Sequence, residues 1–305
     1  MAERDQIDLV QSQARVVTRA ILNFVVDEIG RQTRRHDGDF VRAAVELAVS
    51  QATRGPAGWA TDPARSVSVR AIAGSLGIAY ETCRRKVRAL EALGRCRRLG
   101  PGVAVSPGNF EGAAYEAASA EQWNRLRGSI AELRAIGFDY DLFTHISAQA
   151  PVRADDRLRT IAYLIDDYML RLIESRMAGD EAITDSAVLT AMVTMNAEPM
   201  RHDPDLAWRF AGRDTPPPDS ARAPVTIAML ARRLGMGDDS VGRRVAHLVR
   251  KGWACRVRGG YLSSMEEQQT PAVHQARLMS VLRFLQLVQA LRLLGVDPAT
   301  VAPDA

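Results

Sequence analysis

The chain has 305 residues, of which 47% are hydrophobic and 25% are charged, and this balance excludes a disordered or fibrous protein. At about 150 residues per domain, the length predicts two domains. No apolar run reaches the roughly 18 residues of a membrane-spanning helix, and the polar segment 1–13 is unlike a signal peptide. The cysteines Cys83, Cys96 and Cys255 are too scattered for a disulfide framework or a zinc site. We therefore expect a soluble protein of the reducing cytoplasm, with no metal and no cofactor.

The chain repeats itself. Residues 72–90 match residues 230–248 at an offset of 158, and the same register continues to about residue 139. Upstream, the apolar helix face that includes Ile21 and Val25 matches residues 161 and 165 at an offset of 140. The difference predicts an insertion in the second copy, which we place in the proline-rich segment 200–224. The expected domains are therefore residues 1–150 and 151–305, with the boundary near residues 149–154.

Each copy contains the pattern of two short helices joined by a tight turn. The first helix begins at a hydroxyl residue, Ser68 or Thr226, whose oxygen can accept a hydrogen bond from the first turn. It ends at Gly77 or Gly235, since the turn needs a residue that tolerates a positive φ. The second helix is expected to bury three residues in each copy: Cys83, Val87 and Leu90, or Val241, Val245 and Leu248. This spacing predicts a helix-turn-helix.

A β-hairpin is predicted directly after each helix pair. Residues 94–105 have the pattern of a strand, a Gly-Pro-Gly turn and a second strand, and residues 252–262 form two strands around Gly259 and Gly260. Cys96 and Cys255 are expected to pack within these strands. A helix-turn-helix followed by a hairpin is a winged helix. The sequence thus predicts a mainly α-helical fold of tandem winged helix-turn-helix domains that arose by internal duplication, with long flanking helices.

The second helix of each pair opens with a polar residue, an acid, a Ser or Thr and a hydrophobe, followed shortly by arginine. This pattern spans residues 80–85 and again residues 238–243. Both copies resemble the winged helix-turn-helix of bacterial transcription regulators, most of all the catabolite activator and fumarate-nitrate regulator family. The resemblance covers about 35 residues per copy and implies DNA binding. The nucleotide-sensing β-roll of that family has no counterpart here, because the upstream segment is helical, so nucleotide sensing is not implied.

The same residues suit base recognition. A carboxylate at Glu81 or Asp239 can accept from cytosine N4, and an arginine one turn later can donate to O6 and N7 of guanine. Flanking and hairpin arginines suit phosphates or the minor groove. The candidate DNA-binding residues of the first copy are Ser68, Tyr80, Glu81, Thr82, Arg84, Arg85, Lys86, Arg88, Arg97 and Arg98. Those of the second copy are Thr226, Asp238, Asp239, Ser240, Arg243, Arg244, Arg250, Arg256 and Arg258.

Positive charge is concentrated in the two motif regions. Residues 70–98 and residues 228–258 each contain eight basic and two acidic side chains, a net charge of +6 per region. The whole chain has a net charge of +4, so the remainder carries −8. This segregation favours a polyanionic partner for the two motif regions.

The closing helix of the second copy is apolar nearly all round, unlike its counterpart in the first copy. Small or polar residues around the shared apolar stripe are replaced by leucines: Ala120, Asn124 and Arg127 correspond to Leu278, Leu282 and Leu285. Such a helix must bury a second face. We expect a homodimer with these three leucines at its two-fold contact; the alternative is that this face packs within the chain.

The predicted function is sequence-specific regulation of transcription by a nucleoid-associated protein that binds double-stranded DNA. The two recognition helices differ in sequence, so they should prefer different bases. No phosphate-binding glycine loop, nucleophile elbow or carboxylate pair at helical spacing is found, and no catalytic site is expected. Two alternatives stay open. One is a plasmid-type replication initiator with two winged helices, and the other is a chromosome-organising or protein-interaction protein.

Overall fold

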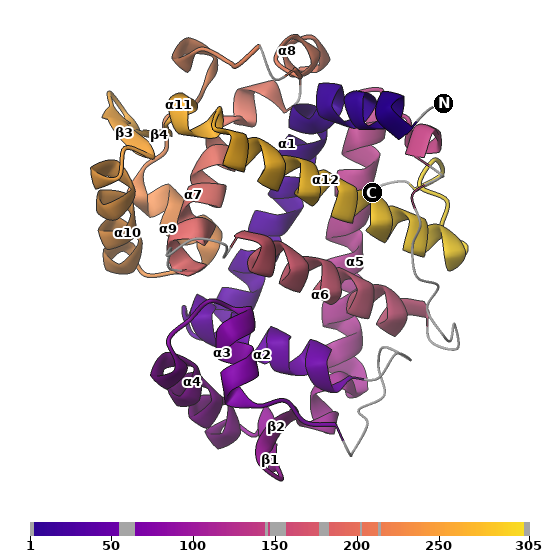
Figure 1. Cartoon of the computed structure of the whole chain (residues 1–305), viewed down its shortest axis with the longest axis vertical. Helices are drawn as coiled ribbons and strands as arrows, with labels where there is room; N and C mark the ends of the chain where they lie inside the picture. Colours follow the sequence, from indigo (N-terminus) through magenta and orange to yellow (C-terminus); the bar gives the residue numbers. More distant parts are fainter. Residues whose placement is uncertain are drawn as a thin grey trace. The chain divides into compact units, whose positions relative to one another are not determined.

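Long helices and two short β-hairpins make up the part of the chain that the computed structural model describes, residues 3–54, 65–143, 146, 157–176, 183–201, 203–212 and 215–301 (Figure 1). The fold is mainly α-helical, and each hairpin is a two-stranded antiparallel sheet. The expected fold class is confirmed at this level. Among the described helices, none is both long and apolar enough to cross a membrane.

The first repeat begins with the long helix α1. In chain order its elements are α1 (Glu3–Arg35), α2 (Phe40–Thr53), α3 (Val69–Ser75), α4 (Tyr80–Ala92), β1 (Cys96–Leu99), β2 (Gly102–Val105), the 3-10 helix η1 (Pro107–Phe110), α5 (Gly112–Ala135) and η2 (Tyr140–Phe143).

The second repeat has the same order of helices and strands. Its elements are α6 (Arg157–Arg176), α7 (Ile183–Asn196), η3 (Glu198–Met200), α8 (Pro204–Arg209), η4 (Asp219–Ala221), α9 (Ile227–Leu234), α10 (Asp238–Arg250), β3 (Ala254–Val257), β4 (Gly260–Ser263), α11 (Met265–Gln268) and α12 (Pro271–Leu293). The expected insertion corresponds to α8, η4 and the segments around them, for which the described residues of the first repeat contain no equivalent.

The hairpins of the two repeats have the same register. Cys96 pairs with Val105 in the first, and Ala254 pairs with Ser263 in the second, again at an offset of 158. In each repeat, the last residue of the helix before the motif accepts a hydrogen bond from the hairpin. The Val105 amide donates to Thr53 Oγ1 at the end of α2 (3.3 Å). The Ser263 amide donates to Asn196 Oδ1 at the end of α7 (2.9 Å). Thr53 and Asn196 are therefore structural equivalents.

The chain folds into two compact units, and these do not coincide with the repeats. Unit 1 contains Met1–Gly38, Ser129–Asp139 and Thr184–Phe284. Unit 2 contains Asp39–Gly128, Tyr140–Ile183 and Leu285–Ala305. The first helix of each repeat thus belongs to the unit that holds the motif helices of the other repeat. A boundary near residues 149–154, which lie outside the described residues, divides the repeats but not the compact units.

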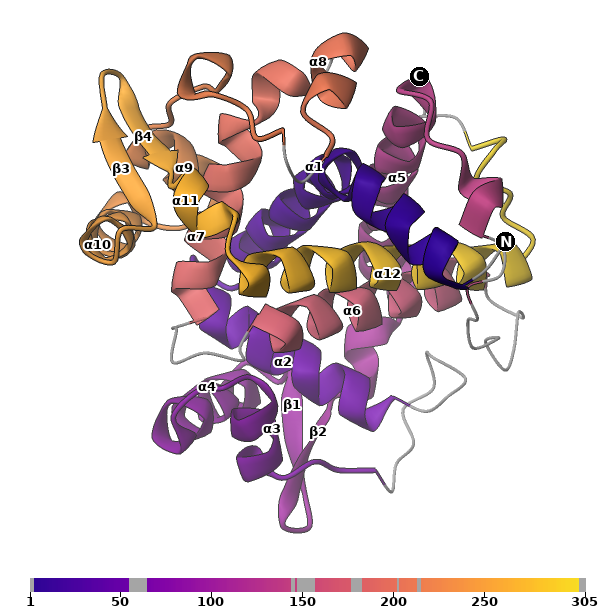
Figure 2. The same cartoon turned by 45° about the horizontal axis from the view of Figure 1, so that its top comes forward.

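Contacts inside each unit show this exchange. In unit 1, α1 packs on α9, and Asp27 of α1 pairs with Arg233 of α9 (Oδ1 to Nε, 3.0 Å). In unit 2, α6 packs on α2, and Glu174 of α6 accepts a hydrogen bond from Ser75 of α3. Ser75 and Arg233 are equivalent at the offset of 158. Each motif is therefore bound at the same position by an acidic residue from the first helix of the other repeat. Figure 2 shows the ribbons of α6 and α2 side by side in unit 2.

The burial of side chains in α12 contradicts part of the expected dimer contact. Leu285 is fully buried within the chain, whereas Leu278 and Leu282 are half-buried. Leu285 is therefore not available to a second molecule. At this position the alternative expectation, that the face packs within the chain, is confirmed. Leu293, near the end of the same helix, is 58% exposed.

Candidate nucleic-acid interface

The helix pair α3–α4 has the expected cap, turn and core. Ser68 Oγ accepts a hydrogen bond from the Ala71 amide (3.1 Å), so this side chain caps α3. The turn passes through Gly77 with a φ of +59°, a conformation that favours glycine. Helix α4 then buries the three residues expected from its sequence, Cys83, Val87 and Leu90, each 0% exposed. The buried stripe fixes the rotation of α4 about its axis and leaves the opposite face toward solvent.

The pair α9–α10 repeats this arrangement. Thr226 Oγ1 accepts from the Met229 amide (3.3 Å), and Gly235 ends α9 with a φ of +64°. Helix α10 buries the expected Val241, Val245 and Leu248. The hydroxyl groups of Ser68 and Thr226 therefore have a structural role, because they cap α3 and α9.

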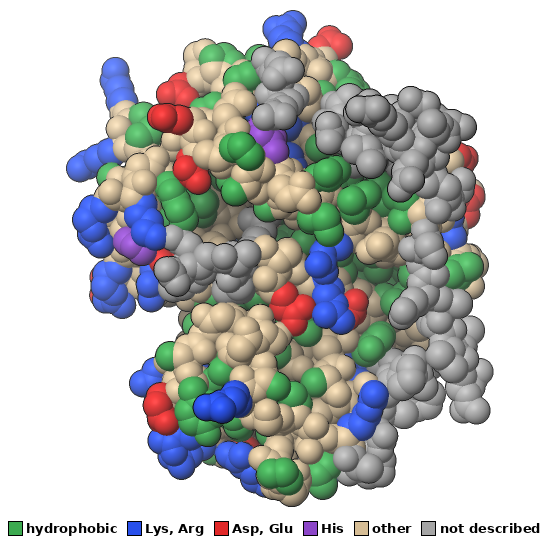
Figure 3. Space-filling view, in the orientation of Figure 1, with side chains coloured by type: hydrophobic (Ala, Val, Ile, Leu, Met, Phe, Trp, Pro, Cys, Tyr) green, Lys and Arg blue, Asp and Glu red, His purple; other side chains and the backbone are tan. Residues whose placement is uncertain are grey.

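The outward face of α4 collects the residues expected to read bases. A hollow on this face is lined by Glu81, Thr82, Arg84, Arg85 and Arg88. Arg85 and Arg88 are exposed, and Tyr80 at the start of the helix is 48% exposed. Figure 3 shows Lys and Arg side chains gathered over the region of α4 in unit 2, and over the region of α10 and its hairpin in unit 1.

Several candidate residues of the first motif are held by acidic side chains. Arg84 Nη2 pairs with Glu81 Oε2 (2.7 Å) across one turn of α4, with both side chains exposed. Lys86 pairs with Asp39, which also caps α2 by accepting from the Arg42 amide. Lys86 therefore contacts the start of α2, and this makes it a structural residue in the free chain.

Acidic side chains also hold one arginine of the first hairpin and two side chains of α10. Arg98 Nε pairs with Glu91 Oε1 of α4 (2.6 Å). Asp185, which is only 1% exposed at the start of α7, accepts contacts from His247 Nδ1 (2.9 Å) and from Arg244 Nη1 (3.4 Å). Arg244 and His247 thus connect α10 to α7.

The remaining candidate arginines form a second group. Arg85, Arg88, Arg243, Arg250, Arg256 and Arg258 are exposed, and Arg97 is half-buried. None of these seven has an ion pair with an acidic side chain among the described residues. Asp238 and Asp239 are exposed at the start of α10, and Thr82 and Ser240 are half-buried beside their arginines. The exposed faces of α4 and α10 therefore each present unneutralised guanidinium groups, a surface that suits a polyanion.

The cysteines separate into two environments. Cys83 in α4 and Cys96 in β1 are buried, and burial raises the pKa of the Cys83 thiol to about 11 and that of Cys96 to about 12. The expected strand packing is confirmed for Cys96. It is wrong for Cys255, which is exposed on β3. A charged thiolate is unfavourable at the two buried sites.

One basic residue near the second motif was not among the candidates. Lys251, directly after α10, places Nζ 4.8 Å from the centroid of the Trp253 ring. This is a cation–π contact, and it holds a lysine next to the hairpin. The sequence signal was its position, because Lys251 is one of only two lysines in the chain and lies in the basic region 228–258.

Comparison with known proteins gives no match for this chain, whether to a family model, a curated protein or a solved structure.

Proposed function

We propose that this chain is a sequence-specific regulator of transcription that binds double-stranded DNA. In this proposal the segments α3–α4–β1–β2 and α9–α10–β3–β4 are two winged helix-turn-helix motifs, and α4 and α10 are their recognition helices. The observation that carries it is the pair of exposed helix faces on which Arg85 and Arg88 of α4, and Arg243 and Arg250 of α10, have no ion pair with an acidic side chain among the described residues. Each face lies opposite a buried apolar stripe, as a helix inserted in the major groove requires.

The dimensions and chemistry of α4 suit this role. At 1.5 Å per residue its 13 residues span about 20 Å, enough to present several side chains along a major groove about 12 Å wide. Arg85 can donate to a guanine through both guanidinium nitrogens. The exposed Glu81–Arg84 pair would open on binding, which frees the carboxylate for a cytosine amino group. An exposed pair of this kind contributes little to stability, so opening it costs little.

The two motifs would read different sequences. The exposed residues that open α4 are Tyr80 and Glu81, whereas α10 opens with Asp238 and Asp239. An arginine occupies the same place in both helices, at Arg85 and Arg243. One chain would therefore prefer an asymmetric or imperfectly repeated site, with a guanine at one position in each half.

Salt dependence tests the proposal directly. A site selected from a pool of random duplexes should bind the chain with a steep fall in affinity as salt increases, because each phosphate contact releases a counterion. With six phosphate contacts, log K should fall with log salt at a slope of about −5. The double variant Arg88→Ala/Arg250→Ala should lower the slope by about 2, whereas Arg171→Ala on α6 is the matched control and should leave it unchanged.

The alternatives predict other outcomes. A protein-interaction module would show negligible affinity for duplex DNA even at low salt, and this result would overturn the proposal. A replication initiator would bind DNA with the same salt dependence, but mapping its sites in the genome would place it at an origin. A transcription regulator would instead be found at promoters.

A further inference from the structure

The two hairpins have the same register, so their residues correspond position by position at the offset of 158. In each motif the first strand of the hairpin packs on the preceding helix, β1 on α4 and β3 on α10. A difference in side chain between equivalent positions therefore changes the same place on each motif. The two hairpins differ in the positive charge that they present at these places.

In the first motif the exposed arginine of the hairpin is neutralised by the helix. Arg98 Nε lies 2.6 Å from Glu91 Oε1 in the last turn of α4, with the Arg98 side chain 49% exposed and that of Glu91 23% exposed. The two-residue turn that follows consists of Gly100 and Pro101, which carry no charge. A neutralised pair beside an uncharged turn attracts a phosphate backbone little.

The other arginines of this region do not replace Arg98. Arg97 is half-buried and lies on the opposite face of β1, because neighbouring side chains of a strand alternate between its faces. Arg95, just before β1, pairs with Glu46 of α2 (Nη1 to Oε2, 2.7 Å). The face of the first hairpin next to the end of α4 therefore presents no net charge through Arg98.

In the second motif the same place carries positive charge that no carboxylate neutralises. Val249 stands where α4 has Glu91, so Arg256, the counterpart of Arg98, has no carboxylate at that position of the helix. Arg258 lies in the two-residue turn, where the first hairpin has glycine and proline. Both arginines are exposed, and neither has an acidic partner among the described residues.

The ends of the two helices differ in the same sense. Helix α10 ends at the exposed Arg250 and is followed by Lys251, which lies beside the ring of Trp253. At the equivalent positions α4 ends at Ala92 and is followed by Leu93, which is 55% exposed. Residues 249–259 thus contain four basic side chains and no acidic one, whereas residues 91–101 contain three basic side chains and one acidic one. Figure 3 shows the Lys and Arg side chains over the hairpin that follows α10.

We propose that the two motifs hold DNA differently. The hairpin β3–β4 and the end of α10 bind the phosphate backbone beside the base pairs that α10 reads, with Arg256 and Arg258 as contacts of the hairpin. In the first motif Glu91 withholds Arg98, so the hairpin β1–β2 does not bind phosphates through it. This inference rests on the proposed DNA binding and adds which parts of each motif touch the backbone.

The Arg98–Glu91 pair differs from the Arg84–Glu81 pair in what its opening leaves behind. When Arg84 leaves Glu81, the carboxylate can accept from a cytosine amino group at the start of the helix. Glu91 lies ten residues further along α4, about 15 Å at 1.5 Å per residue. If Arg98 left Glu91 for a phosphate, the carboxylate would remain beside that phosphate and repel it. The second pair therefore opposes backbone binding, whereas the first does not.

Matched variants test the difference through the salt dependence of binding to the site selected from random duplexes. Arg256→Ala/Arg258→Ala should make the slope of log K against log salt less steep by about 2, because two phosphate contacts are lost. Arg98→Ala is the control at the position equivalent to Arg256 and should leave the slope unchanged. The inference is overturned if Arg98→Ala makes the slope less steep by about 1, or if the double variant leaves it unchanged.

Glu91→Val places the residue of the second motif in the first and releases Arg98. This variant should make the slope steeper by about 1, because one phosphate contact is gained. The gain should disappear in Glu91→Val/Arg98→Ala. All these side chains are at least partly exposed, so each variant should keep the helical circular dichroism spectrum of the unaltered chain. An unchanged slope in Glu91→Val, or a gain that persists without Arg98, would contradict the role given to Glu91.

Ethylation of single phosphates provides a second measurement, which needs no variant of the hairpins. Ethyl groups that block binding should extend further from the centre of the site in the half read by the second motif. That half is identified as the one whose base preference is relaxed by Arg243→Ala. Equal extents in both halves would refute the difference between the hairpins while leaving the proposed function intact. Absence of duplex binding at low salt would instead overturn the proposed function and this inference together.

Discussion

Gly30 of α1 lies against the backbone of Arg233 at the end of α9, so closely that a β-carbon at Gly30 would clash with the Arg233 carbonyl oxygen. A β-carbon at Gly235, which ends α9, would be 2.9 Å from the Gly30 carbonyl oxygen. Within unit 1 the first helix of one repeat thus meets the motif of the other repeat backbone to backbone. The residue of α6 equivalent to Gly30 is the buried Leu170, so unit 2 does not reproduce this approach.

Gly30→Ala should therefore destabilise the protein. The added methyl group has backbone atoms on its far side, which cannot move without shifting α9, and overpacking of this kind costs about 1–3 kcal/mol. Urea unfolding followed by circular dichroism measures the loss. Gly74→Ala is the matched control, because a β-carbon there meets no atom within 4 Å and alanine favours the helix α3. Equal stability of the two variants would contradict the close approach.

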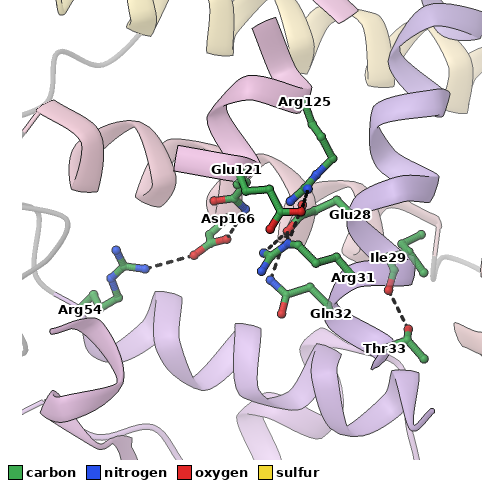
Figure 4. A network of polar contacts seen from close by, with 10 residues as sticks. Glu28, Ile29, Arg31, Gln32, Thr33, Arg54, Glu121, Arg125 and Asp166 are labelled. Carbon is green, nitrogen blue, oxygen red and sulfur yellow. Dashed lines mark hydrogen bonds and ion pairs between the residues drawn. The ribbon is translucent and has the colours of Figure 1, made fainter. Parts of the chain in front are cut away.

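Asp166→Asn should destabilise unit 2 strongly. Arg54 is fully buried, and its partner Asp166 (Figure 4) is 16% exposed and also accepts from Gln122 (3.1 Å). Replacement of the carboxylate by an amide breaks a buried charge–charge contact, and breaking such a contact costs about 3–5 kcal/mol. Glu81→Gln breaks an exposed pair and should change the free energy of unfolding by less than about 1 kcal/mol. The interpretation of the Arg54 pair fails if both variants unfold at the same urea concentration.

The three thiols should react at very different rates. At pH 8 the native chain should react promptly with Ellman's reagent at Cys255 alone, because Cys83 and Cys96 are buried and their raised pKa values keep them protonated. Three thiols should react after unfolding. Prompt reaction of two or three thiols in the native chain would contradict this.

The same raised pKa values predict a loss of stability in alkaline solution. The ordinary pKa of a cysteine thiol is about 9. Below this pH both cysteines are protonated in the folded and the unfolded chain. Above pH 9 the unfolded chain loses these protons first, so unfolding is favoured progressively up to about pH 11 to 12. The double variant Cys83→Ala/Cys96→Ala should lose less stability between pH 8 and pH 10 than the unaltered chain.

Arg85→Ala and Arg243→Ala should each weaken binding to the selected DNA site by about 1–3 kcal/mol and relax the preference at one base pair. The two positions affected should lie in different halves of the site, because the arginines occupy equivalent places in different motifs. Arg256→Ala, on the hairpin, should weaken all sequences about equally. Binding competition with single-base variants of the site distinguishes these effects. If both recognition arginines can be removed with unchanged affinity, α4 and α10 are not the recognition helices.

Local patterns in the sequence determined the elements of both motifs. The hydroxyl caps at Ser68 and Thr226, the glycines at positive φ and the buried stripes of α4 and α10 all follow from interactions within about ten residues of chain. The internal match added the equivalence of the two copies and the insertion within the second copy. These features depend on backbone sterics and on helical period, so the sequence alone was sufficient for them.

Tertiary structure alone decided which segments meet. The internal match shows that α1 and α6 are equivalent, but not which motif each one packs on, because either choice buries the same apolar face. Tertiary structure also decided the ion pairs of Lys86, Arg98 and Arg244, because their acidic partners come from other elements. The burial of Leu285 within the chain likewise depends on tertiary structure.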